Sequence, residues 1–212
     1  MPGCSSEKSR HARWIRRMGY LAAVLLTSGC GGSTASPSPA TLHAEVGDPV
    51  GDALADPSAR VSPDLTHATV DVSNGSITVA VRFAPGAFDP ASSRLTVQLE
   101  TDQNPSTGIR QAGGFDVDYT IDMPAFSSQA NILKAVPNAA CTSIDPCYVQ
   151  VGTVPLSVSS DSMTATVPLS LLGNADGRCM FRIVAYVSLA GVASSYTADA
   201  MPDMTLPPAH VP

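Results

Sequence analysis

The sequence predicts an all-β protein, an antiparallel β-sandwich of about nine short strands. After residue 65, short runs alternate apolar and polar side chains, as half-buried strands do. Two such runs flank Asn74-Gly75, and Asn-Gly between alternating runs is the strongest short-range signal for a β-hairpin. No long amphipathic helix separates the runs, so the helical crossovers that a parallel sheet requires are missing.

The expected strands follow one another with turn residues between them. The first hairpin pairs 66–73 with 76–83, and clean alternation recurs at 95–100 and 115–122. A single helical turn ending in a glycine is expected at 168–173. The core-facing side chains of the first hairpin are expected to be Val70, Val72, Ile77, Val79, Val81 and Phe83. Further strands are expected at 129–136, 147–153, 155–159, 162–168 and 180–190.

The first 29 residues have the pattern of a secretory signal peptide. A basic segment precedes the uncharged apolar run 18–26, which is shorter than the roughly 20 apolar residues that cross a bilayer. The segment Leu26-Thr27-Ser28-Gly29-Cys30 resembles the bacterial lipobox, in which the cysteine is acylated and becomes the first mature residue. We expect lipidation of Cys30. The alternative is an ordinary cleaved signal followed by an unrelated cysteine.

Three regions are therefore expected along the chain. Residues 1–29 form the signal peptide, 30–42 form the lipidated cysteine with a Gly/Ser/Pro tether, and 43–212 form one β-sandwich domain. The lipid anchor would make the membrane a partner and place the domain outside the cytoplasm. Gly31 follows Cys30 where aspartate would signal inner-membrane retention, so the outer membrane is expected in a Gram-negative host.

The charge balance of the mature chain is strongly acidic. Five of the 12 basic residues and one of the 18 acidic residues precede residue 30, which leaves 7 basic and 17 acidic residues, a net charge of −10. Nucleic acid is not an expected partner, because its phosphates need a basic face. Calcium is the natural partner of such an exported domain. Trp14 lies in the signal, and a mature domain without tryptophan argues against a typical carbohydrate-binding module.

Three cysteines remain in the mature domain besides Cys30. Cys141 and Cys147 flank a segment containing Asp145-Pro146, which favours a turn, so a local Cys141–Cys147 disulfide is expected. Cys179 would then be an inert buried thiol. The alternative pairing joins Cys179 to either of the other two.

The candidate site is a hairpin with carboxylates on one face. Side chains alternate along strands, so Glu100 and Asp102 should lie on the outer face of one strand and Asp116 and Asp118 on the outer face of the next, together with Gln98 and Asp122. Carboxylates that face one another destabilise a sheet, and a calcium ion would convert that repulsion into attraction. The expected ligand set is Glu100, Asp102, Asn104, Thr107, Asp116 and Asp118, with backbone carbonyls near 106 and 107.

The spacing differs from that of an EF-hand. The glycine expected at the sixth position of such a loop is Pro105, and the glutamate expected at the twelfth is Gln111. The alternative to a calcium site is a solvated acidic face in which Asn104-Pro105 and Thr107-Gly108 only form turns.

A resemblance to known domains strengthens the calcium hypothesis. The string 100–108 followed by Gly114-Phe115-Asp116-Val117-Asp118-Tyr119 resembles the "DTD-x-N-x-x-TG … G-x-D-Y/F" pattern of exported bacterial β-sandwich domains, with Glu100 at the first aspartate. A "D-P-x-G-D" opening stands at 48–52 and a "D-x-x-P-D" ending at 199–203. The domain is similar to family 9 carbohydrate-binding modules and DOMON-type sandwiches. The resemblance implies a sandwich and favours calcium, but implies no specific ligand.

No catalytic constellation is recognisable in the sequence, so we do not expect an enzyme. The chain has no Gly-x-Ser-x-Gly elbow, His-Glu-x-x-His motif or phosphate-binding glycine loop. Two function classes compete, and a hydrolase with an unrecognised site is a third alternative. One is a surface-anchored, calcium-stabilised binding or adhesion module for a glycan or another envelope component. The other is a structural or accessory envelope lipoprotein without a small-molecule ligand.

Overall fold

The computed structural model describes residues 41–55, 61–104, 107–111, 114–136, 147–188 and 197–212. The expected signal peptide, Cys30, most of the tether and Cys141 lie outside these residues. The described part is all-β, which confirms the predicted fold class, and it holds thirteen strands rather than about nine. The strands are β1 (Leu42–Gly47), β2 (Leu65–Ser73), β3 (Ser76–Phe83), β4 (Ser93–Glu100), β5 (Ile109–Arg110), β6 (Asp116–Val117), β7 (Tyr119–Pro124), β8 (Gln129–Ala135), β9 (Tyr148–Val158), β10 (Ser162–Pro168), β11 (Cys179–Val187), β12 (Thr197–Met201) and β13 (Ala209–Val211).

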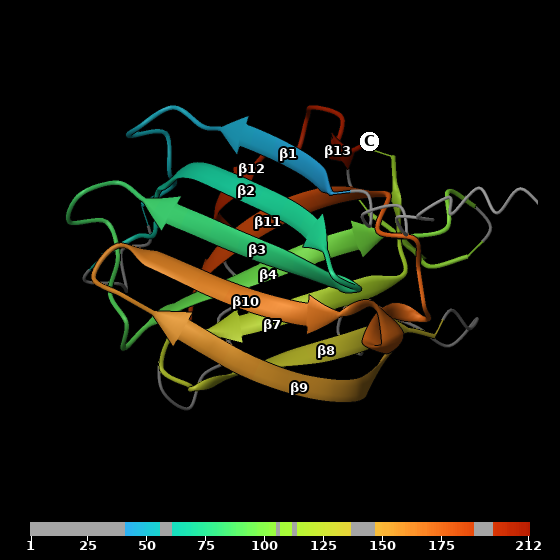
Figure 1. Cartoon of the computed structure of the whole chain (residues 1–212). Coiled ribbons are helices and arrows are strands. Elements are labelled where there is room, and N and C mark those ends of the chain that lie inside the picture. Colours follow the sequence, from blue (N-terminus) through green and yellow to red (C-terminus); the bar gives the residue numbers. More distant parts are fainter. Residues whose placement is uncertain (1–40, 56–60, 105–106, 112–113, 137–146, 189–196) are drawn as a thin grey trace, which may run out of the picture. The chain divides into compact units, whose positions relative to one another are not determined.

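The strands form two layers of one continuous antiparallel sheet. The order is β1-β2-β3-β10-β9-β8-β7-β4-β11-β12, β13 pairs with β11, and β5 and β6 form a separate small sheet. The long strand β9 joins the layers, because 148–155 pair with β8 and 156–158 pair with β10. Figure 1 shows β1, β2, β3 and β10 in front of β11, β4, β7 and β8.

Local sequence signals account for the best-predicted elements. The β2–β3 hairpin closes at Asn74 and Gly75, whose φ values of 50° and 73° are those of a type I′ turn. The expected helical turn is the 3₁₀ turn η1 (Leu169–Leu172), and Gly173 caps it in the left-handed conformation. The two expected strands 147–153 and 155–159 are one continuous strand, β9.

The space between the layers is filled by aliphatic side chains. Val70, Val79 and Val81 from the first layer and Val97 and Ile183 from the second are fully buried in one apolar cluster. Burying one such side chain contributes about 1.5–3 kcal/mol. Among the residues that the structure describes, no helix is both long and apolar enough to cross a bilayer.

The other face of β4 and β11 is also buried, which differs from the solvated face expected from alternation. Gln98 and Glu100 point away from the main core, as predicted, and so does Arg182, yet all three are buried. Two segments lie over this face: the Phe115 ring centroid is 5.2 Å from Arg182 Cζ, and the carbonyl of Leu206 accepts a hydrogen bond from Arg182 Nη2. The candidate carboxylates therefore lie at the edge of a second buried region. This region is polar and lies on the face of β4 and β11 that points away from the main core.

Candidate cation sites

The first carboxylate cluster lies where β4 ends. Glu100 is the last residue of β4, Asp102 follows in the next turn, and Asp118 is the bend between β6 and β7. The backbone N–H of Asp118 donates to the carbonyl of Leu99, which fixes the bend beside the end of β4. One oxygen from each carboxylate lies within 4.8 Å of the others. Two oxygens that bind one Ca²⁺ at about 2.4 Å lie at most about 4.8 Å apart, so a single ion can reach all three.

Of the three carboxylates in this cluster, that of Glu100 has the poorest hydrogen bonding. Its side chain is 2 % exposed, and both carboxylate oxygens are buried without a hydrogen-bond partner of normal geometry. Burial and repulsion by Asp118 and Asp102 raise the pKa of Glu100, while the nearby backbone N–H groups of Gln103 and Asn104 oppose the rise. A buried carboxylate with so little hydrogen bonding is costly, and a cation would offset that cost.

The hydroxyl of Thr107 stands at the centre of the remaining oxygens. Thr107 Oγ1 lies 3.0 Å from both carboxylate oxygens of Asp102, 3.2 Å from Asp118 Oδ1 and 2.9 Å from the carbonyl of Asn104. A hydroxyl has one proton and donates to one acceptor at a time. Acceptors therefore outnumber donors around Thr107, as expected of a ligand shell for a hard cation.

Gly108 allows the loop to approach Asp118. Its φ is +73°, and a Cβ at this position would lie 2.7 Å from the carbonyl oxygen of Val117 and 2.9 Å from Asp118 Oδ1. Any side chain would therefore displace the backbone that carries Asp118. The Thr107-Gly108 pair thus supplies an oxygen and the space in which the carboxylates converge.

The other predicted ligands occupy different positions. Asn104 remains beside the cluster, and its backbone N–H donates to Asp102 Oδ1 at 2.9 Å. Asp116 is held away from it in an ion pair with Arg110 across β5 and β6, and Asp122 is bound by Arg94 and Asn131. Alternation placed Asp116 and Asp118 on one face, but the bend at Asp118 ends that alternation. The carbonyl of 106 lies outside the described residues.

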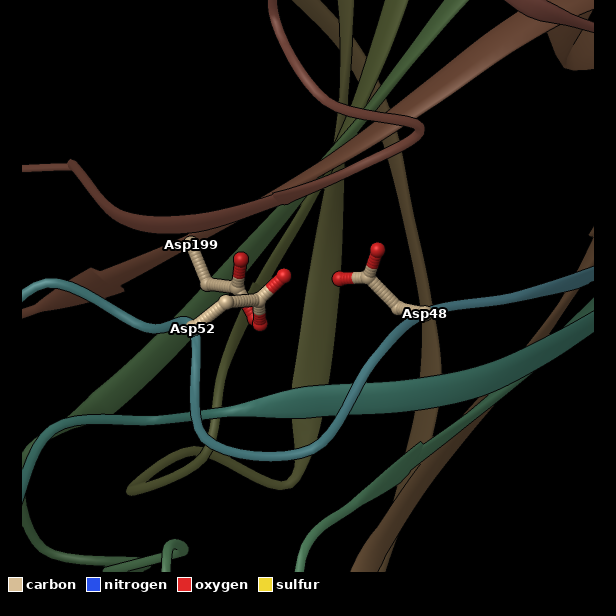
Figure 2. Close-up of side chains that lie close together, drawn as sticks. All are labelled: Asp48, Asp52 and Asp199. Atoms are coloured by element: carbon tan, nitrogen blue, oxygen red, sulfur yellow. The ribbon is translucent and has the colours of Figure 1, made fainter.

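A second carboxylate cluster joins segments that are far apart in the sequence. Asp48 follows β1, Asp52 lies in the next turn, and Asp199 lies on β12. One oxygen of each lies within 4.8 Å of the others. Figure 2 shows the carboxylate of Asp48 pointing toward those of Asp52 and Asp199. The loop is held against β12 by a 2.7 Å hydrogen bond from the N–H of Leu54 to the carbonyl of Ala198.

Asp64, directly before β2, lies against this second cluster. It is 6 % exposed; its Oδ2 accepts a 2.8 Å hydrogen bond from the N–H of Gly51, while its Oδ1 is buried without a partner. The Oδ2 atom of Asp48 is also buried without a partner.

The pKa values of Asp48 and Asp199 in this second cluster are raised, because several negative charges lie close together and are partly buried. Burial first, then repulsion by Asp199, Asp52 and other carboxylates including Asp64, raises the pKa of Asp48 to about 7. Burial and repulsion by Asp52 and Asp64 raise the pKa of Asp199 to about 6, against the backbone N–H groups of Leu65 and Ala200. Negative charge on this cluster is thus poorly compensated by the described residues.

Sequence reasoning missed this second cluster as a site. The two segments that contribute Asp48, Asp52 and Asp199 were recognised only as the opening and ending of a family-like pattern. Their meeting depends on β12 and β2 lying beside one another across the sandwich, a contact that no local signal predicts. Apart from its position before a predicted strand, nothing in the sequence marked Asp64 as a site residue.

A pocket of about 580 Å³ borders the first cluster. Asp102, Thr107 and Asp118 line it, together with Tyr119 and Lys134. Tyr119 and Lys134 are paired residues of β7 and β8, and Lys134 Nζ lies 6.0 Å from the centroid of the Tyr119 ring. Lys134 is the only lysine after residue 8. The pocket therefore combines carboxylates with one cationic side chain.

The two described cysteines are in different states. Cys147 is disulfide-bonded, and Cys179 is a free thiol with 2 % exposure. Cys141 lies outside the described residues, so the Cys141–Cys147 pairing stays a prediction. Burial, with smaller contributions from Glu100 and Asp176, raises the pKa of Cys179 to about 12. The thiolate, which is the reactive form, is therefore almost absent at neutral pH.

We expect Cys179 to resist alkylation in the folded protein. At pH 8 without reductant, iodoacetamide should leave Cys179 unmodified, and guanidinium should make it fully reactive. Peptide mapping of the same samples should find Cys147 modified only after reduction, together with Cys141. Rapid labelling of native Cys179, or labelling of Cys147 in unfolded, unreduced protein, would contradict this assignment.

Comparison of the chain with protein-family models and with curated proteins found no match. The features that bear on function are therefore the all-β fold, the two carboxylate clusters and the adjacent pocket. These features define an all-β domain with two candidate sites for hard cations.

Proposed function

We propose that the chain is an exported, lipid-anchored binding module whose β-sandwich holds calcium at Glu100, Asp102 and Asp118. The observation that carries the proposal is the carboxylate of Glu100, buried to 98 % beside two further carboxylates without a hydrogen-bond partner of normal geometry. Calcium prefers six to eight oxygens and accepts irregular geometry. Thr107, the Asn104 carbonyl and water would complete the shell. The lipid anchor follows from the lipobox-like segment at Cys30.

The adjacent pocket indicates the chemistry of a ligand. A bound calcium would present positive charge to the pocket, and Lys134, which also lines it, adds a second positive charge. Such a pocket suits a ligand with carboxylate or neighbouring hydroxyl groups, as in an acidic saccharide of the cell envelope. Among the described residues, Phe126 is the only exposed large aromatic side chain, and the one aromatic residue that lines the pocket, Tyr119, is 6 % exposed. Recognition would depend on charge and oxygen coordination.

Binding of the purified chain to an array of neutral and acidic glycans, with calcium and with chelator, tests this function. We expect binding to acidic glycans that requires calcium and falls at least tenfold in Lys134→Gln. Arg178→Gln, which removes an exposed positive charge outside the pocket, is the matched control and should bind like wild type. Calcium binding without any glycan binding would favour the structural or accessory envelope role instead.

A further inference from the structure

The second carboxylate cluster combines close spacing of its carboxylates with burial of some of their oxygens. Three of its carboxylates converge within the 4.8 Å that one calcium ion can span. Beside them, Asp64 is more than nine-tenths buried, with one oxygen bonded to the 48–52 loop and the other without a partner. A cluster that only needed hydration would not bury two partnerless oxygens, on Asp64 and on Asp48. The members of the cluster are Asp48, Asp52, Asp64 and Asp199.

We propose that these four aspartates bind a second calcium ion. They contribute up to four negative charges and a mixture of buried and exposed oxygens, which is the ligand chemistry of Ca²⁺. Protein zinc sites are built mainly on cysteine and histidine, and the cluster contains neither. A pocket of about 250 Å³ lined by Asp52, Asp199 and Asp203 opens beside the cluster and gives water and the ion access.

The structural role of this ion would be to hold the margins of the sandwich together. Asp48 and Asp52 extend from β1, Asp64 begins β2, and Asp199 lies on β12 at the opposite end of the sheet order. The N–H of Leu65 already donates to Asp199 Oδ2 at 2.6 Å, which shows how closely β2 approaches β12. An ion bound to all three segments would prevent the first strands from separating from β12.

The proposal is independent of the site at Glu100. Glu100 is paired with Met180 and Asp199 with Ala185, so the two sites lie five residues apart along β11. Five residues of a strand span roughly 17 Å, which exceeds the Debye length of about 8 Å at physiological salt. The two sites share no residue, and a change in one leaves the other intact.

Calorimetric titration of the metal-free chain with CaCl₂ at pH 7.5 tests the proposal. We expect two calcium ions per wild-type chain and one per chain in Asp64→Asn, with the remaining ion lost in Asp64→Asn combined with Glu100→Gln. Asparagine can still accept the hydrogen bond of Gly51, so the variant should fold. Asp52→Asn, at an exposed residue, should weaken the same binding event at least tenfold. Asp161→Asn, an exposed aspartate outside both clusters, is the control for charge and should bind two.

The outcomes separate the two proposals. If Asp64→Asn and Asp52→Asn bind calcium as wild type does, the second site is refuted and the site at Glu100 is unaffected. If Glu100→Gln alone binds as wild type does while Asp64→Asn loses one ion, the second site stands and the proposed function fails.

Discussion

Millimolar calcium should raise the melting temperature of the metal-free chain by about 5–10 °C for each occupied site. An ion that binds only the native state stabilises it by RT ln(1 + [L]/Kd), about 2.7 kcal/mol at a hundredfold excess over Kd. For a domain of this size, 1 kcal/mol shifts the melting temperature by roughly 2–4 °C. Differential scanning fluorimetry at pH 7.5 with calcium and with EDTA measures the shift.

Substitutions assign the shift to the first site. In an Asp64→Asn background, Asp102→Ala and Asp118→Ala should each abolish the remaining effect of calcium. Asp102→Ala removes one of several repelling carboxylates at an exposed position, so it should not melt much below its parent in EDTA. Asp118→Ala should melt lower than its parent, because Asp118 accepts a hydrogen bond from the N–H of Thr101. Magnesium should stabilise less, because it requires a tight octahedral shell and loses water reluctantly. Identical melting curves in calcium and EDTA would support a solvated acidic face.

Much of the fold could be predicted because its signals are local. The Asn74-Gly75 turn, the alternation at 95–100 and the 162–168 strand each appear in a short segment, and all three are strands or turns as expected. β1, β5, β12 and β13 were not predicted. β12 (TADAM) and β13 (AHV) are short, and they are held by pairing with β11 rather than by their own sequence.

The candidate site could be predicted only in part, because some of its features depend on segments that are distant in the sequence. Glu100, Asp102, Asn104 and Thr107 are close in sequence, so they remain close in any turn that connects β4 to β7. Asp118 joins them because it forms the bend, whereas Asp116, two residues earlier, is bound by Arg110. Alternation assigns a residue to a face but does not indicate whether another segment covers that face. Burial of Glu100 depends on such a covering segment, so it could not be predicted.

Replacing Arg182 with alanine should destabilise the domain by about 3–5 kcal/mol, the range for large buried side chains cut to alanine. Arg182 is 0 % exposed; its guanidinium donates to the carbonyl of Leu206 and packs against Phe115. Alanine would leave a cavity and an acceptor without its donor. Chemical denaturation should therefore show a lower midpoint, and the melting temperature should fall by roughly 10 °C.

Two further variants distinguish packing from charge. Arg182→Met keeps an unbranched side chain of similar length but has no donor and no charge. Because burial lowers the pKa of Arg182, its charge is costly in this environment, and a buried ion replaced by an apolar side chain is often tolerated. We therefore expect methionine to recover at least half of the alanine loss. Arg178→Ala, at an exposed arginine directly before β11, should change stability by less than about 0.5 kcal/mol. A methionine variant as unstable as alanine would instead assign the stability to the hydrogen bond with Leu206 and to the charge over Phe115.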